Sequence, residues 1–99
     1  MHILDGIVFH MDETRASEIE ATRTAVANEL RARRAYRRMT QAQLIKASGV
    51  SKSAIERLEG GKRDMDIPQL VAIAAALNIS AVEFMQSVEN ALNAVQRDS

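Results

Sequence analysis

The chain has 99 residues, enough for one small domain with a single core, and it has no cysteine, which excludes disulfides and cysteine zinc sites. Its three aromatic residues are too few for the stacking surfaces of proteins that bind single-stranded nucleic acids. The formal net charge is zero because a basic middle offsets two acidic flanks. Residues 31–63 contain 10 Lys/Arg and 2 Asp/Glu, whereas residues 1–30 contain 2 Lys/Arg and 6 Asp/Glu, and residues 64–99 contain 1 Lys/Arg and 5 Asp/Glu.

Residues 1–12 differ from the rest of the chain. Apolar residues surround the turn signal Asp5-Gly6, a pattern that fits a small hairpin, an added strand or a frayed arm without choosing among them. The apolar stretch ILDGIVF is far shorter than a membrane span and lacks the basic flank of a signal peptide. We therefore expect a cytoplasmic protein with no membrane partner.

From Glu13 onward the chain reads as helical, because alanine is abundant and strand-like alternation is absent. The first helix is expected to run from after Asp12 to about Arg37. Its apolar or small positions keep a spacing of three and four, with Arg23 as an interruption; they are Ala16, Ile19, Val26 and Leu30.

Two short helices are expected next. Thr40 is the N-cap of the first of them, in which Leu44 and Ala47 face inward, and Gly49 ends it. Ser51 caps the following helix, residues 51–59, whose buried side is Ile55 and Leu58, and Gly60-Gly61 closes it.

A fourth helix follows Asp66, with Pro68 in its first turn, where a missing N–H costs little. Its core stripe is Leu70, Ile73, Ala74 and Leu77. Asn78 and Ser80 mark the break before a fifth helix that runs from residue 81 to about residue 96. The sequence thus predicts an all-α fold of five helices.

Residues 40–59 have the parts of a helix-turn-helix: a helix, a short turn with glycine, and a second short helix. In this unit the second helix enters the major groove of double-stranded DNA. The polar side chains on the outer face of this second helix would then face the bases. They are Lys52, Ser53, Glu56 and Arg57.

The basic middle of the chain favours the same anionic partner. Alternatively, the opposite charges neutralise each other across the folded surface. The acidic flanks also have two readings: they cover the basic face as autoinhibitory segments, or they are the solvated faces of the outer helices.

The stretch TQAQLIKASGVSKSAIERLEGGKR followed by IPQLVAIAAALNIS resembles the lambda-repressor-like (Cro-type, also called XRE) helix-turn-helix family. The resemblance covers roughly residues 30–85, over half of the chain. It implies a compact five-helix DNA-binding domain, with Gln41 anchored to a phosphate and with Lys52, Ser53 and Arg57 reading bases. It also implies a partly buried ion pair between Arg34 and Glu59.

Side-chain chemistry agrees with these roles. Arg57 can donate two hydrogen bonds to guanine O6 and N7, and Lys52 can reach the same edge. Ser53 discriminates weakly, and Glu56 either accepts from a cytosine amino group or pairs with Lys52 one turn away. The expected contacts to the DNA backbone are Arg38, Thr40, Gln41, Lys46, Ser51, Lys62 and Arg63.

Two positions depart from the family pattern. Arg38 stands where the family often has glycine, and an arginine, Arg33 or Arg37, stands where it commonly has an apolar residue. Either several arginines of the first helix are free to contact phosphates, or Arg33 packs through its methylenes alone.

The fifth helix carries a two-heptad apolar seam that begins at Ala81 and continues through Met85, Val88, Leu92 and Val95. The last four of these residues are expected to pair with a second subunit. The alternative is that Phe84 and Met85 dock on the domain while the rest of this helix covers the first helix of its own chain. His2 and His10 lie near acidic residues, but we expect no metal, because residues so close to a terminus are usually solvated. No nucleophile–His–acid set and no phosphate loop point to an enzyme or a cofactor.

The sequence therefore predicts a DNA-binding transcriptional regulator, a repressor that binds a pseudo-palindromic operator as a homodimer and blocks polymerase. Residues 25–80 would be the DNA-binding domain, residues 1–24 an arm of unknown role, and residues 81–99 a dimerisation helix. Two other hypotheses remain: an antitoxin that binds a toxin protein and regulates its own operon, and a helix-turn-helix scaffold for protein contacts alone.

Overall fold

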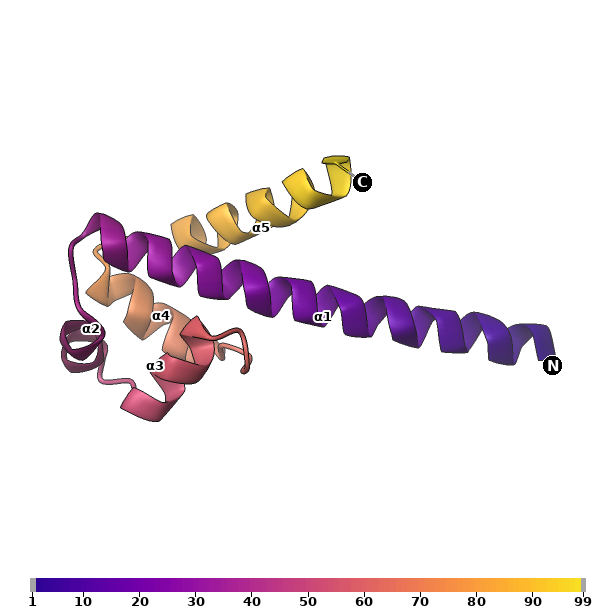
Figure 1. The fold of residues 1–99 in the computed structure, drawn as a ribbon, viewed down its shortest axis with the longest axis horizontal. Helices are drawn as coiled ribbons and strands as arrows, with labels where there is room; N and C mark the ends of the chain where they lie inside the picture. The colour runs from indigo at the N-terminus through magenta and orange to yellow at the C-terminus, as the bar shows by residue number, and fades with distance from the viewer. Residues whose placement is uncertain (1, 99) are drawn as a thin grey trace.

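The computed structural model describes the backbone of residues 2–98 and the side chains of residues 13–95. It contains five helices, α1 (His2–Tyr36), α2 (Gln41–Ser48), α3 (Lys52–Glu59), α4 (Ile67–Ala76) and α5 (Ala81–Asp98), and no strand within residues 2–98. Figure 1 shows α1 along the whole molecule, with α2, α3 and α4 beside its C-terminal half and α5 returning on the other side. The all-α prediction is confirmed.

The core lies beside the C-terminal half of α1, where α3 and α5 contact that helix and α2 and α4 pack against them. Every helix contributes at least one side chain that is almost inaccessible to solvent; the largest are Leu30, Leu44, Ile55, Leu58, Ile73, Leu77, Phe84 and Val88. Helix α1 contacts both α3 and α5, so it holds the two sides of the domain together.

The helix starts follow local capping signals. Thr40 and Asp66 form capping boxes with Gln43 and Gln69, so side chains satisfy backbone N–H groups that have no partner inside the helix. Ser51 caps α3 in the same way through the N–H of Ala54, at 3.2 Å. The predicted starts of these three helices are confirmed.

The helix ends require backbone in the left-handed region. Gly49 has φ 73° at the end of α2, and Gly61 has φ 68° after α3. Two non-glycine residues adopt the same conformation, Arg38 with φ 53° after α1 and Asn78 with φ 62° after α4. Asparagine tolerates this region, but arginine does not favour it, so the glycine-like position of Arg38 is strained.

The start of α1 differs from the prediction. The helix begins at His2, so the expected start after Asp12 and the hairpin and strand readings of residues 1–12 are wrong. The pair Asp5-Gly6 favours a turn only where the neighbouring residues do not favour a helix. Here it lies within α1.

The buried stripes also differ from the prediction at three positions. Ala16 and Ile19 are exposed, Ile19 by 50%, because α2, α3 and α4 reach only the C-terminal half of α1. Ala47 is exposed as well, and Val50 just beyond α2 is buried in its place.

Within the described part of the chain, no single helix is both long enough and apolar enough to cross a membrane. Helix α4 and the part of α5 up to Val95 are long and apolar enough only when taken together, and the two are bent by 103° relative to each other. Helices that form the core of a protein often have the same length and composition.

Candidate nucleic-acid interface

Helix α3 has one buried and one polar face, as its spacing requires. Ala54, Ile55, Leu58 and Glu59 are buried against the domain. The four residues expected to read bases, Lys52, Ser53, Glu56 and Arg57, are all exposed. Lys52 and Glu56 form no ion pair with each other in the described side chains, so both remain available to a ligand.

The turn before α3 is tight because Gly49 adopts φ 73° while its N–H bonds to the carbonyl of Ile45 at 2.9 Å. No atom lies within 4 Å of the place where a Cβ would stand at Gly49. Glycine is thus required here by backbone conformation rather than by space, and it sets the direction in which α3 leaves α2.

The loop after α3 rests on α1. A Cβ added at Gly61 would lie 3.9 Å from Ala27 Cβ and from the backbone of Arg23 and Thr24. Next to it, Arg23 Nε donates to Asp64 Oδ1 at 2.6 Å, and this hydrogen bond lowers the pKa of Asp64 and raises that of Arg23. Lys62 and Arg63, both exposed, are therefore carried by a loop that the Arg23–Asp64 pair ties to α1.

A buried carboxylate joins α1, α2 and α3. Arg34 Nε and Nη2 donate to Glu59 Oε2 and Oε1 at 2.8 and 2.9 Å, and this pairing raises the pKa of Arg34. Gln41 Nε2 donates to the same Oε1 at 3.1 Å, and Arg31 donates to the backbone carbonyl of Glu59. The end of α3 is thus fixed by three side chains from other helices.

Arg33 and Arg37 are not free for phosphates, because both have partners within the protein. Arg33 donates to Glu29 at 2.5 Å, to Glu83 at 3.0 Å and to Ser87 at 2.9 Å. Arg37 donates to the carbonyl of Leu77 at 2.9 Å. Both expectations for Arg33 are therefore wrong: its guanidinium binds carboxylates on α1 and α5 instead of projecting to DNA or packing by its methylenes alone.

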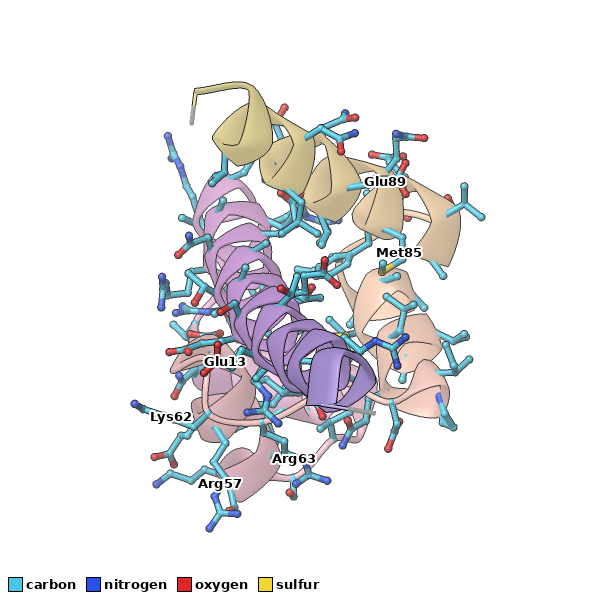
Figure 2. All side chains as sticks on the ribbon, turned by 90° about the vertical axis from the view of Figure 1, so that its right-hand side faces the viewer. Glu13, Arg57, Lys62, Arg63, Met85 and Glu89 are labelled. Atoms are coloured by element: carbon cyan, nitrogen blue, oxygen red, sulfur yellow. The ribbon has the colours of Figure 1, made fainter. Side chains whose placement is uncertain are left out.

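Seven basic side chains remain exposed and without a described ion pair or hydrogen bond within residues 13–95. One is Arg15, in the N-terminal half of α1, and the other six are Arg38, Lys46, Lys52, Arg57, Lys62 and Arg63. Figure 2 shows that Arg57, Lys62 and Arg63 lie together on the lower side of the molecule, whereas Met85 and Glu89 of α5 lie on the upper right. Thr40 and Ser51, also expected at the DNA backbone, are exposed N-caps, and Gln41 is half-buried at the Glu59 network. We call the six basic residues other than Arg15 the basic surface.

The predicted seam of α5 divides into two sets. Met85 and Val95 are exposed and Leu92 is half-buried, but Val88 is only 1% exposed and belongs to the core of its own chain. The expectation that Val88 contacts a second subunit is wrong, because α5 uses this residue to pack on its own domain.

Among the described side chains, no three of His, Cys, Asp and Glu lie close enough to hold a metal ion. The side chains of His2 and His10 lie outside the described residues. Sequence reasoning missed the Arg23–Asp64 pair, whose partners stand 41 residues apart with no local signal to connect them.

The arrangement agrees with known proteins. Residues 25–84 match the model of a family described as helix-turn-helix domain. No curated protein matches the chain.

Solved structures share the fold. The clp gene regulator ClgR from Corynebacterium glutamicum is 30% identical, with a TM-score of 0.67, and the match covers 78% of this chain and 84% of that one. The restriction-modification controller protein C.AhdI from Aeromonas hydrophila is 26% identical over 63% of this chain and 94% of its own, with a TM-score of 0.60. The controller protein C.Esp1396I, solved as a tetramer with its natural 35 base-pair operator, is 25% identical over 70% and 91%, with a TM-score of 0.64. The chain belongs to the helix-turn-helix domain family.

Proposed function

We propose that this chain is a sequence-specific regulator of transcription that binds double-stranded DNA with α3 in the major groove. The observation that carries the proposal is the polar face of α3: four exposed side chains able to bond base edges, on a helix whose opposite face is buried. Similar regulators support it, one of them a controller protein bound to its operator.

The basic surface would supply the affinity that does not depend on sequence. Lys62 and Arg63 leave the C-terminal end of α3, and Lys46 lies in the last turn of α2, so cations lie on both sides of the helix-turn-helix. Phosphates bound there would fix the register in which Lys52, Ser53, Glu56 and Arg57 meet bases. Thr40, Gln41, Ser51 and Arg38 would complete the backbone contacts.

The regulator would act as a homodimer, since a single α3 reads too few base pairs to select one site. An exposed apolar surface is suited to this pairing: Ile67 and Val71 lie one turn apart on α4, and Val82 and Met85 lie one turn apart on α5. Ile67 and Met85 line the same surface cavity, so the exposed apolar residues of the two helices come together there. This area replaces the seam that included Val88.

Repression would follow from occupancy of the operator in competition with polymerase, in the cytoplasm where the DNA lies. No residue of this scheme needs a catalytic role or a cofactor. The residue groups 1–24, 25–80 and 81–99 would then be an arm, the DNA-binding domain and a C-terminal helix.

The proposal is tested by selection from a pool of random duplexes, followed by affinity for the selected sequence across a salt series. We expect an inverted repeat with half-sites about 10 base pairs apart. Log K should fall with log salt with a slope of about −0.9 per phosphate contact. Enrichment of no sequence, together with a flat response to salt, would show that the helix-turn-helix serves protein contacts instead.

A further inference from the structure

The structure contains a groove that the proposed DNA binding does not use. Helices α1 and α5 run in opposite directions and separate toward the end of α5, as Figure 1 shows. The groove between them has a volume of about 690 Å³. Its apolar part is formed by Ala21 and Ala25 of α1 and by Leu92 and Val95 of α5.

The polar edge of this groove carries charge of one sign. Glu18 and Glu20 of α1 and Glu89 of α5 line it, and no Lys or Arg does so among the residues whose side chains are described. None of the three carboxylates forms a described ion pair. Glu29 and Glu83, by contrast, both pair with Arg33. Glu20 also lies near enough to Arg23 to help raise the pKa of that guanidinium, but the main partner of Arg23 is Asp64. The groove therefore keeps negative charge that no described ion pair neutralises.

The shape fits a helix. The α1 wall extends from Ser17 to Asn28, about 16 Å or three helical turns. Its side chains are small, so the backbone of α1 can be approached closely and large apolar side chains must come from the occupant. Val95 is 67% exposed, which leaves an apolar side chain in solvent at the open end of the groove.

We propose that the α1–α5 groove binds a basic amphipathic helix of another protein. Large apolar residues on one face of that helix would cover Leu92 and Val95, and Lys or Arg on its flanks would pair with Glu18, Glu20 and Glu89. The three carboxylates repel DNA and anionic lipid, so neither is the occupant.

Two other occupants fit less well. A second copy of the chain would bring the same carboxylates against themselves in a two-fold pairing, which costs free energy. A small molecule would find no buried polar atom to orient it, because every buried side-chain N or O in the described chain already has a partner.

The test uses three synthetic 18-residue peptides as probes, with affinity measured by calorimetry. One has leucine at the a and d positions of a heptad and lysine elsewhere, the second has glutamate in place of lysine, and the third is a scrambled form of the first without an apolar face. We expect the basic amphipathic peptide to bind about tenfold or more tightly than either of the others. Its binding should perturb the backbone NMR signals of residues 17–28 and 89–95.

Two matched variants locate the site. Val95→Asp should weaken binding of the basic peptide about tenfold. Gln86→Asp adds the same charge at an exposed position of α5 outside both the groove and the proposed dimer area, and it should leave binding unchanged. Combined Glu18→Gln, Glu20→Gln and Glu89→Gln should abolish the preference for the basic over the acidic peptide. None of these substitutions lies in the basic surface, so DNA binding by each variant can be measured in a separate experiment. The result of that experiment tests the proposed function and does not bear on the groove.

Equal affinity for the three peptides, or an unchanged affinity in Val95→Asp, would overturn the proposal. So would sedimentation equilibrium in which Val95→Asp, but not Gln86→Asp, lowers the mass of the protein alone, since the groove would then hold a second copy.

Discussion

Arg34 and Glu59 meet edge to edge, with Nε 2.8 Å from Oε2 and Nη2 2.9 Å from Oε1. The pair connects the last turns of α1 to the last residue of α3, and Glu59 is only 5% exposed. A bidentate pair of planar groups fixes an angle as well as a distance. The orientation of α3 on the domain therefore depends on this contact.

Replacement of Glu59 by Gln should lower the free energy of unfolding by about 3 kcal/mol, because it leaves the guanidinium of Arg34 without a carboxylate in a largely buried place. Urea denaturation measures the loss. Glu56→Gln is the matched control on the same helix: Glu56 is exposed, and its replacement should change stability by less than about 0.5 kcal/mol. Similar losses in the two variants would contradict the structural role of the pair.

Replacement of Arg38 by Gly should stabilise the protein by about 1 kcal/mol, because Arg38 has φ 53° and glycine adopts this conformation without a Cβ clash. Arg38→Ala is the control, since alanine keeps the Cβ and should leave stability nearly unchanged. Urea midpoints of the two variants distinguish relief of backbone strain from removal of a positive charge. If both variants gain equally, charge repulsion in the basic surface is the cause.

Much of the fold could be predicted from the sequence because its signals are local. The two residues of each capping box are only three positions apart, Thr40 with Gln43 and Asp66 with Gln69. The residues at the start of each helix therefore form the hydrogen bonds that cap it. The polar face of α3 is equally local, since it depends only on helical spacing within eight residues.

Contacts between distant segments could not be predicted in the same way. Arg33 finds Glu83 and Ser87 at separations of 50 and 54 residues, and nothing near Arg33 in the sequence marks them. The heptad spacing through Val88 is the same whether the helix packs on its own chain or on a second one. Only the position of α5 against α1 decides that Val88 is internal.

Replacement of Arg23 by Gln should raise the pKa of Asp64 toward its ordinary value of about 3.9. In the folded protein the hydrogen bond from Arg23 lowers this pKa, so the pair adds stability above the unfolded pKa and loses it as pH falls through the folded one. An NMR titration of the Asp64 carboxyl carbon in both proteins measures the change. An unaltered Asp64 curve would mean that the loop after α3 is not held by this pair.

Replacement of Val71 by Asp should convert a dimer into a monomer, because a carboxylate would enter the apolar area proposed for pairing on α4 and α5. Val71 is exposed in the single chain, so its replacement should leave the monomer folded. Sedimentation equilibrium and circular dichroism measure the two effects. Val95→Asp is the control outside this area and should keep the dimer. If both Val71→Asp and Val95→Asp remain dimers, the dimer contact lies on another surface.

Arg57→Ala and Lys62→Ala should weaken DNA binding in different ways. Arg57 projects from the polar face of α3, so its loss should cost about 1–3 kcal/mol at one base pair of each half-site and relax the preference there. Lys62 lies in the loop after α3, so its loss should weaken all sequences alike and reduce the salt slope by about 1. Affinities for the selected operator and its single-base substitutions, at several salt concentrations, measure both. A base-selective effect of Lys62→Ala would show that the loop enters the groove, and a uniform effect of Arg57→Ala would show that α3 lies across the backbone instead.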